Sequence, residues 1–258
     1  MNDKRDLLEK HKELFLKIVN CKDSIDLNGL NEEEKITDEK MIVVCQALRK
    51  NTSFKEIHFW YNEIGSNGIQ NLAEILKINS TLINLNLSWN HLIGLEGIRS
   101  LSECLKINST ITTLHLSSNK MGDQEIDLLC ESLILNSTLK ELDLSYNNIG
   151  DEGMKIISET LKINSSLEDI NLFNNKIKDK GAHSLLEALF FNYSLKNLTI
   201  NGNQNKIGEY LQDEISNMVK ENKSKPERAI KRVEKNMKKS SLIKFSLIFL
   251  VNLFFLLF

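Results

Sequence analysis

A repeat of about 28 residues constrains the fold of this chain more than any other feature of its sequence. Five consecutive segments share one spacing of apolar residues and asparagine, L-x-x-L-x-L-x-x-N-x-L, and each starts one period after the segment before it. A sixth, less regular segment follows one period after the fifth. The six segments begin at Phe54, Leu82, Ile111, Leu139, Leu167 and Leu195. A fixed period of this length predicts a solenoid of stacked units.

Each unit contains two parts with different hydrophobic periods. In the unit that begins at Leu139, the alternating pair Leu142 and Leu144 predicts a short strand with one buried face. Downstream, Met154, Ile157 and Leu161 recur at helical spacing. Neither element can bury its apolar side alone, so strands must stack on strands and helices on helices. The predicted fold is an α/β solenoid with a parallel sheet on its concave side and helices outside.

The repeats are predicted to span residues 24–219 in about seven units, with terminal units that differ because they must face water. Residues 1–23 predict one capping helix, because Leu14, Phe15 and Ile18 share a helical face with apolar residues upstream. At the other end, Asn203 keeps the asparagine spacing, whereas Ile207 arrives two positions late. Residues 220–241 are interpreted as a basic linker, and residues 242–258 as a hydrophobic tail.

One asparagine recurs in each unit at the point where the strand ends. Backbone groups that leave a strand there have no ladder partner, and a buried carboxamide both donates and accepts hydrogen bonds. We therefore interpret this series as a structural ladder and not as a binding site. Its members are Asn62, Asn90, Asn119, Asn147 and Asn175.

These repeats resemble the ribonuclease-inhibitor-like class of leucine-rich repeats, whose unit has about 28 residues and a full helix. The class includes ribonuclease inhibitor, the repeat regions of NOD-like receptors and the GTPase-activating protein for Ran. The resemblance implies a curved, protein-binding horseshoe. It leaves two alternatives: a GTPase-activating protein similar to the Ran activator, and a fragment similar to an innate sensor. The Ran activators usually carry an acidic tail after their repeats, whereas the tail here is basic and apolar.

No catalytic or metal-binding pattern occurs in the sequence. It has no glycine-rich phosphate loop and no His-Glu-x-x-His, and its four cysteines form no close pair. We therefore expect a protein that is not an enzyme and has no cofactor, metal or small-molecule substrate. Residues 1–219 contain 23 basic and 32 acidic residues, a balance that argues against a nucleic-acid partner.

The residues that flank the buried strand leucines are expected to face the concave side, where an unidentified protein partner would bind. Trp60 and Phe173 are the predicted anchors, because exposed aromatic residues on a rigid sheet dominate many interfaces. Tyr61, Trp89 and Tyr146 lie one position further into the turn, and packing against neighbouring turns is the alternative for all five aromatic residues. The predicted partner-binding residues are Glu56, His58, Trp60, Asn86, Trp89, His115, Glu141, Asp143, Tyr146, Asp169, Asn171 and Phe173.

The end of the chain, residues 242–258, is apolar except for Lys244, Ser246 and Asn252. As a helix it would extend about 26 Å, close to the roughly 30 Å of a bilayer core. Residues 220–244 contain ten basic and three acidic residues. The pattern resembles a tail anchor that holds the repeats on the cytoplasmic side of a membrane. The alternative is that this segment packs as a helix against the solenoid.

Overall fold

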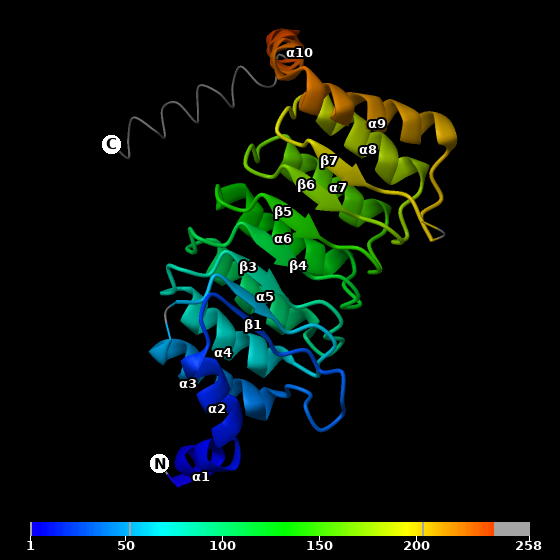
Figure 1. Cartoon of the computed structure of the whole chain (residues 1–258). Coiled ribbons are helices and arrows are strands. Elements are labelled where there is room, and N and C mark those ends of the chain that lie inside the picture. Colours follow the sequence, from blue (N-terminus) through cyan, green and yellow to red (C-terminus); the bar gives the residue numbers. More distant parts are fainter. Residues whose placement is uncertain (1, 52, 203, 240–258) are drawn as a thin grey trace.

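The computed structural model describes residues 2–51, 53–202 and 204–239. Seven short strands form one parallel sheet in chain order, and a row of helices covers its other side (Figure 1). The strands are β1 Ser24–Asp26, β2 Glu56–His58, β3 Asn84–Asn86, β4 Thr113–His115, β5 Glu141–Asp143, β6 Asp169–Asn171 and β7 Asn197–Thr199. The helices are α1 Asn2–Lys10, α2 Lys12–Asn20, α3 Asp38–Lys50, α4 Ser66–Leu76, α5 Gly94–Leu105, α6 Asp123–Leu135, α7 Asp151–Leu161, α8 Asp179–Leu189, α9 Glu209–Ser224 and α10 Pro226–Lys239. The predicted α/β solenoid with a parallel sheet is confirmed.

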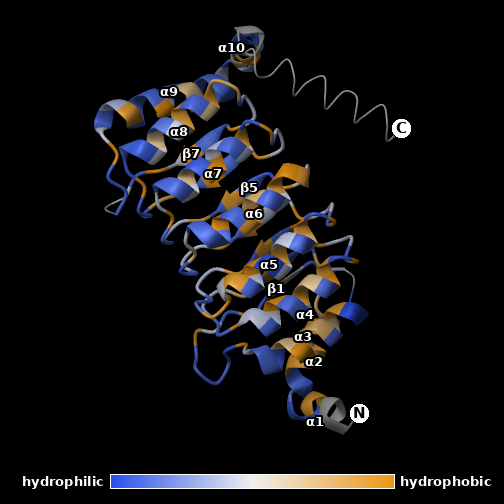
Figure 2. Cartoon of the chain, turned by 180° about the vertical axis from the view of Figure 1, so that it is seen from behind, coloured by the Kyte–Doolittle hydropathy of each residue, from blue (hydrophilic) through white to orange (hydrophobic). Residues whose placement is uncertain are grey.

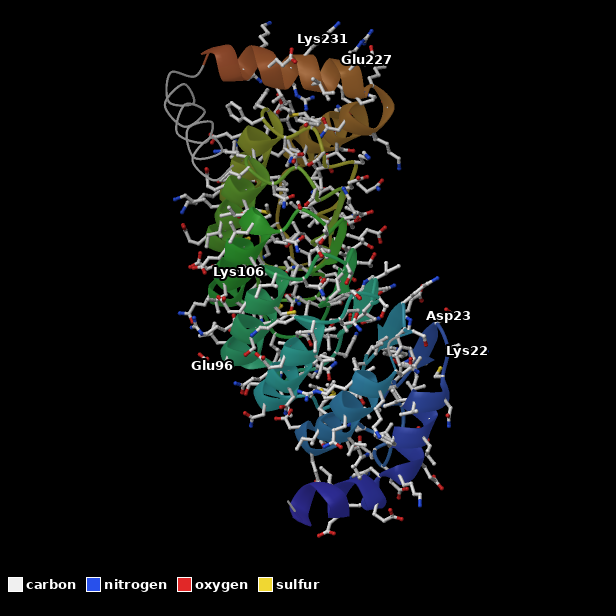
Figure 3. All side chains as sticks on the ribbon, turned by 90° about the vertical axis from the view of Figure 1, so that its left-hand side faces the viewer. Lys22, Asp23, Glu96, Lys106, Glu227 and Lys231 are labelled. Carbon is white, nitrogen blue, oxygen red and sulfur yellow. The ribbon has the colours of Figure 1, made fainter. Side chains whose placement is uncertain are left out.

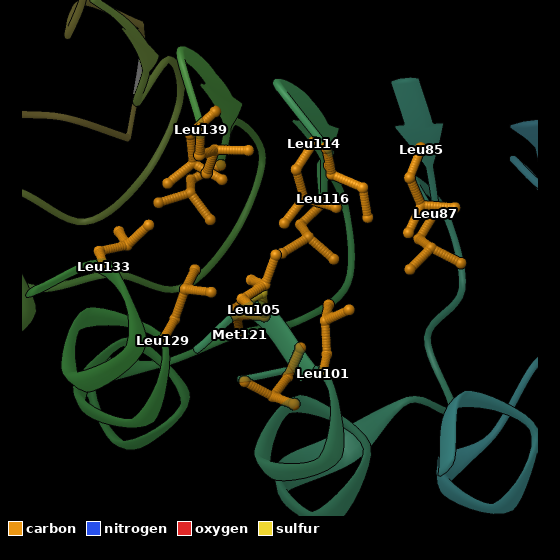
Figure 4. Close-up of a cluster of buried hydrophobic side chains, with 14 of the residues drawn as sticks. Leu85, Leu87, Leu101, Leu105, Leu114, Leu116, Met121, Leu129, Leu133 and Leu139 are labelled. Atoms are coloured by element: carbon orange, nitrogen blue, oxygen red, sulfur yellow. The ribbon is translucent and has the colours of Figure 1, made fainter. Parts of the chain in front are cut away.

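The repeat register is kept from strand to strand. Leu114, Leu142 and Ile170 are the central residues of β4, β5 and β6, and the three pair as neighbours in the sheet. Each is at most 3% exposed. Figure 4 shows how leucines from the strands meet leucines from α5 and α6 in a continuous layer. Stacking buries a face that no single unit could cover, which is why the units form one core.

The helices are amphipathic, and each contacts its neighbours in the chain (Figure 2). In α7, Met154, Ile157 and Leu161 face the core, as their helical spacing predicts. The helix starts are linked by carboxylates: Asp151 Oδ1 accepts hydrogen bonds from the backbone N–H groups of Lys178 and Gly181, at 2.8 and 2.9 Å. Glycine is needed at such positions. A Cβ on Gly153 would lie 2.5 Å from Asp123 Oδ1 of the preceding helix.

Residues 1–23, predicted as one capping helix, form two helices in their described part. The backbone at His11, with φ −116° and ψ 34°, leaves the helical region and separates α1 from α2. The second helix does the capping: Ile18 is fully buried, and Leu14 and Phe15 pack against the core.

Residues 220–241, predicted as a linker, are instead mainly helical where the structure describes them. Helix α9 continues to Ser224, α10 contacts it, and Ala229 and Val233 of α10 are buried. Arg232 forms an ion pair with Glu221 and donates to the Leu189 carbonyl oxygen at 3.1 Å. The reason is that the basic run carries apolar residues four apart on one helical face.

The described helices include none that is both long and apolar enough to cross a membrane. The predicted tail, residues 242–258, lies outside the described residues.

Two series of asparagines, most of them buried, run the length of the solenoid. The first, which we call the strand-exit ladder, contains the predicted series. Asn147 is typical: its Oδ1 accepts from the N–H groups of Asn119 and Met121, each at 3.0 Å. Its Nδ2 donates to the carbonyl oxygens of Leu116 and Leu144, each at 3.0 Å. The members are Asn62, Asn90, Asn119, Asn147, Asn175 and Asn205.

The last member of this ladder among the described residues is Asn205; Asn203, which keeps the asparagine spacing of the sequence, lies outside the described residues. Asn205 Oδ1 accepts from Ile177 N–H at 3.0 Å, and its Nδ2 donates to the Leu172 carbonyl at 2.9 Å. The distance to the next apolar residue carries the signal, because Asn205 stands two positions before Ile207 just as Asn147 stands two positions before Ile149. The delay therefore moves the asparagine together with the isoleucine.

The second series, the helix-exit ladder, lies where each outer helix returns to the sheet. Asn164 Nδ2 donates to the Leu133 carbonyl of the preceding unit at 2.7 Å, and its Oδ1 accepts from Ser166 and Leu167 N–H groups. This role was not predicted, although one asparagine per repeat at the helix end was the signal in the sequence. The members are Asn51, Asn79, Asn108, Asn136, Asn164, Asn192 and Asn222.

Candidate protein-binding face

The outward residues of the seven strands form one continuous surface, which we call the sheet face. Each strand has three residues, and the first and third point away from the buried central one. The third residues lie side by side in the order His58, Asn86, His115, Asp143, Asn171. The first residues bring Glu56, Glu141 and Asp169 into a parallel row. All eight strand residues predicted for the partner site thus share one surface.

The sheet face is acidic. Five outward positions of the described strands hold a carboxylate, and no outward position of these strands holds Lys or Arg. The five are Asp26, Glu56, Glu141, Asp143 and Asp169. Because these carboxylates are held on a rigid sheet, a basic partner would meet them without a further ordering cost in the sheet.

Two of these carboxylates differ in environment. Burial by itself would raise the pKa of Asp143, but the nearby His115 ring and the hydrogen bonding from Ser145 outweigh it and lower the pKa below its usual value. The Ser145 N–H lies 2.9 Å from Asp143 Oδ1, and His115 Nδ1 lies 3.8 Å from Asp143 Oδ2. Burial raises the pKa of Asp169, and a hydrogen bond from Asn197 and the charge of Lys223 offset only part of that rise. Asp143 therefore carries the more firmly fixed negative charge.

The exposed fractions of the aromatic residues do not follow the order in which these residues were predicted to anchor a partner. The expected anchors Trp60 and Phe173 are only partly exposed, whereas Tyr61, Trp89 and Tyr146 are 43%, 43% and 51% exposed. These three have φ values of 61°, 58° and 55°, in the left-handed region. A residue in that conformation departs from the strand alternation, which accounts for the outward position of these three rings.

The exposed rings form two groups at the edge of the sheet face. In the first, the Tyr61 ring centroid lies 6.2 Å from Trp60 and 6.0 Å from Trp89, and His91 continues the row at 5.9 Å from Trp89. In the second, Tyr146 and Phe173 lie 5.3 Å apart. Ring pairs at these distances stabilise each other, so both groups are preformed surfaces.

A shallow groove of about 380 Å³ lies beside the first aromatic group. Lys35 and Glu63 line one part of it, with Nζ 3.2 Å from Oε1, and the Lys35 ammonium lies 5.8 Å from the centre of the Tyr61 ring. Exposed Leu92 supplies an apolar patch. Aromatic, aliphatic and charged groups around one depression are typical of a protein interface.

The described residues contain no group of three His, Cys, Asp or Glu side chains that could hold a metal ion. His58 and His115 sit on strands two positions apart, with β3 between them. Their nearest acidic partners are Glu56 and Asp143, on the same strand and on the adjacent one. The geometry of the sheet face therefore fits the binding of a partner through surface contacts.

Comparison with known proteins agrees with this architecture. Five segments match the family model described as Leucine Rich repeat: residues 50–73, 79–102, 108–124, 135–158 and 164–186. The chain therefore carries leucine-rich repeats, stacked into an α/β solenoid. No curated protein matches the chain.

Two solved structures share the fold. One is Leiomodin-1 Actin-Binding Site 2 (ABS2), which matches with a TM-score of 0.56 and 20% identity over 68% of this chain and 98% of that one. The other is the tropomodulin C-terminal domain from Caenorhabditis elegans, with a TM-score of 0.52 and 18% identity over 67% of this chain and 99% of that one. Identities this low establish similarity of fold alone.

Proposed function

We propose that this protein is a binding scaffold whose sheet face and aromatic edge hold a basic segment of a protein partner. The observation that carries the proposal is the charge of the sheet face: five carboxylates and no lysine or arginine at the outward positions of the described strands. Opposite charge on the partner would guide association and suppress acidic competitors. The exposed rings would supply the contact area that charge alone does not.

The backbone of the aromatic residues supports this role. A bulky residue in the left-handed region costs roughly 1–2 kcal/mol relative to an ordinary conformation. In the equivalent positions of two other units stand Ser118 and Asn174, also with positive φ. The turn therefore accepts small polar residues, and Tyr61, Trp89 and Tyr146 are not required by the fold. A binding role accounts for large rings at positions that the fold leaves free.

Attachment to a membrane is the second part of the proposal. Residues 242–258 are long enough to cross most of a bilayer core and follow a basic segment. The positive-inside rule then places the repeat domain on the cytoplasmic side. Attachment would raise the local concentration of the scaffold near membrane-bound partners.

We also propose that the repeats are of the ribonuclease-inhibitor-like class. The length of the repeat unit and the helix of 11–13 residues in each central unit support this assignment.

Actin is a specific candidate for the partner. The name of one structural neighbour includes an actin-binding site, and that neighbour is covered over 98% of its length. Because fold does not fix function, the sheet face has to be tested directly. Co-sedimentation of the full chain with actin filaments, and gel filtration with monomeric actin, distinguish actin from other proteins that carry a basic segment.

A photo-crosslinking amino acid placed at Tyr146 in cells tests the sheet face. The same substitution at Tyr210, which is 75% exposed on α9, is the matched control. We expect protein adducts from position 146 and not from position 210. The adducts should fall when Glu56 and Glu141 are both replaced by Lys, and persist in Glu187→Lys, which reverses an exposed charge on α8. Equal adducts from both tyrosines, or no loss in the double variant, would contradict the proposal.

A further inference from the structure

A row of exposed aliphatic side chains lies on the opposite edge of the solenoid from the aromatic residues. In four consecutive units the residue just before the helix-exit asparagine is aliphatic and 60–78% exposed. We call this row the aliphatic ridge. It consists of Ile78 (78% exposed), Ile107 (63%), Leu135 (66%) and Ile163 (60%).

Charged residues bound the ridge. The equivalent position is Lys50 in the first unit and Glu221 in the last. In the unit between Ile163 and Glu221, partly buried Phe191 takes the position, beside Phe190, which is 40% exposed. The apolar surface therefore covers the middle of the solenoid and stops where its ends begin. Such a boundary indicates a surface of defined length.

The ridge residues do not serve the core. A single exposed leucine or isoleucine is ordinary, but a contiguous row of them marks a surface that another body covers. Four adjacent helices at roughly 8–10 Å spacing give the row a length of roughly 30 Å. Position in the repeat does not demand these residues, because Lys50 fills the same place in the first unit.

The composition of the ridge favours lipid over protein. Protein interfaces concentrate their binding energy in Trp, Tyr and Arg, whereas the ridge contains only Ile and Leu. A projecting row would need a matching groove on a protein, but a fluid bilayer adapts to it.

The lysines beside the ridge suit the same environment. Lys77, Lys106 and Lys162 precede three of its members directly in the chain. Each lies 2.6–2.7 Å from a glutamate three positions earlier. The apolar stems of these lysines can follow the ridge while the ion pairs stay at the level of the lipid headgroups.

The helix-exit edge holds the ridge residues in one row, and the basic helix α10 lies beside it. Parallel repeats end their helices at the same edge, so the ridge members lie in one row; Figure 3 includes this region, with Lys106 at the end of α5 labelled. At the last units α10 reaches the same edge, since Asn236 Nδ2 donates to the Phe190 carbonyl at 3.0 Å. The exposed basic residues Arg228, Lys231 and Lys235 of α10 would face anionic headgroups nearby.

We propose that the aliphatic ridge inserts into the interfacial layer of a lipid bilayer and orients the solenoid on it. This inference deepens the membrane attachment proposed above and rests on it. The sheet face would then stand at an angle to the membrane, with both aromatic groups on the edge away from the lipid. A bound partner would be presented toward the cytoplasm.

A polarity-sensitive fluorophore attached through an introduced cysteine tests the contact. Burial raises the pKa of the Cys45, Cys104 and Cys130 thiols to about 12, which leaves them unreactive in the folded chain. With Cys21→Ser in the background, a maleimide dye labels Ile107→Cys on the ridge. Leu92→Cys, on the opposite edge at a site 60% exposed, is the matched control. The full chain is mixed with vesicles of phosphatidylcholine and phosphatidylserine, and vesicle binding is measured by flotation.

We expect the emission at position 107 to move to shorter wavelength on vesicle binding and to be quenched by brominated lipid, with no change at position 92. In a chain that also carries Ile78→Ser, Leu135→Ser and Ile163→Ser, the shift at position 107 should be lost.

Three results would overturn the inference. Flotation without a shift at position 107 would leave the membrane attachment intact and remove the ridge from it. A chain that does not float at all would contradict both proposals. A shift at position 107 that needs no vesicles and grows with protein concentration would assign the ridge to contact between two copies of the chain.

Discussion

The two edges of the solenoid share an asparagine ladder but differ in the side chains that they expose. At each edge an asparagine, buried in most units, recurs once per unit, and in several units the residue just before it is exposed. At the strand-exit edge that residue is Tyr61, Trp89 or Tyr146, with positive φ. At the helix-exit edge it is Ile or Leu in four consecutive units.

The difference shows which positions the architecture fixes and which it leaves free. The asparagine carries the hydrogen bonds between units, so its identity follows from the fold. Where the preceding side chain is exposed, as at Tyr61, Trp89 and Tyr146, packing in the core does not constrain it. Aromatic rings at one edge and aliphatic chains at the other therefore report on what each edge contacts.

The largest expected effect separates the two ladders. Asn147→Ala would leave three backbone groups without this partner, the N–H groups of Asn119 and Met121 and the carbonyl of Leu116, and each such buried group costs about 1–3 kcal/mol. We expect the free energy of unfolding in urea to fall by at least about 3 kcal/mol. The helix-exit residue Asn79 is partly exposed, so Asn79→Ala should cost only about 1 kcal/mol. Similar losses in the two variants would show that the ladders contribute alike.

The next largest effect is the separate loss of partner binding at one edge and of vesicle contact at the other. Tyr61→Ser with Trp89→Ser should weaken partner capture by about tenfold or more, equivalent to about 1.4 kcal/mol, without changing vesicle contact. The serine variants of the aliphatic ridge should do the reverse. Both are measured on the same full chain, by crosslinking yield and by the fluorescence shift at position 107. A variant that affects both readouts would mean that the edges form one site.

A pH series tests Asp143 on the sheet face. Its pKa is lowered in the folded chain, so the carboxylate contributes stability above the unfolded pKa near about 4, and that contribution is lost as the pH falls through the folded pKa. Asp143→Asn removes it. We expect the stability difference between wild type and variant to be full at about pH 6 and to shrink steadily below about pH 4. A difference that stays constant down to about pH 3 would exclude the charged form as its source.

The smallest expected effect concerns backbone conformation. Lys120 is exposed with φ 60°, a conformation that glycine adopts without strain, so Lys120→Gly should stabilise the fold by about 0.5 kcal/mol. Ser109→Gly, at an exposed helix-exit position outside the positive-φ residues, should destabilise it by a similar amount. Urea unfolding of both variants measures the difference. If both glycine variants were more stable than wild type, backbone strain would not distinguish the strand-exit edge from the helix-exit edge.

Much of this architecture could be predicted because it repeats. The repeat period places Leu114, Leu142 and Ile170 side by side in the sheet. It also brings the eight predicted strand residues of the sheet face together. Near the ends the period weakens, and there the prediction departed from the structure: α1 and α2 are separate helices, Asn205 takes the last ladder position, and α10 packs where a linker was expected.

The sequence by itself determined the order of the units, the buried face of each strand and helix, and the spacing of the asparagines, because these depend on periods that local geometry enforces. Tertiary structure alone decided which aromatic rings are exposed. The left-handed backbone at Tyr61, Trp89 and Tyr146 belongs to the turn between stacked units. The alternation of side chains along a strand cannot predict it. Tertiary structure also decided that four distant aliphatic residues form one ridge, since their proximity exists only after the helices have stacked.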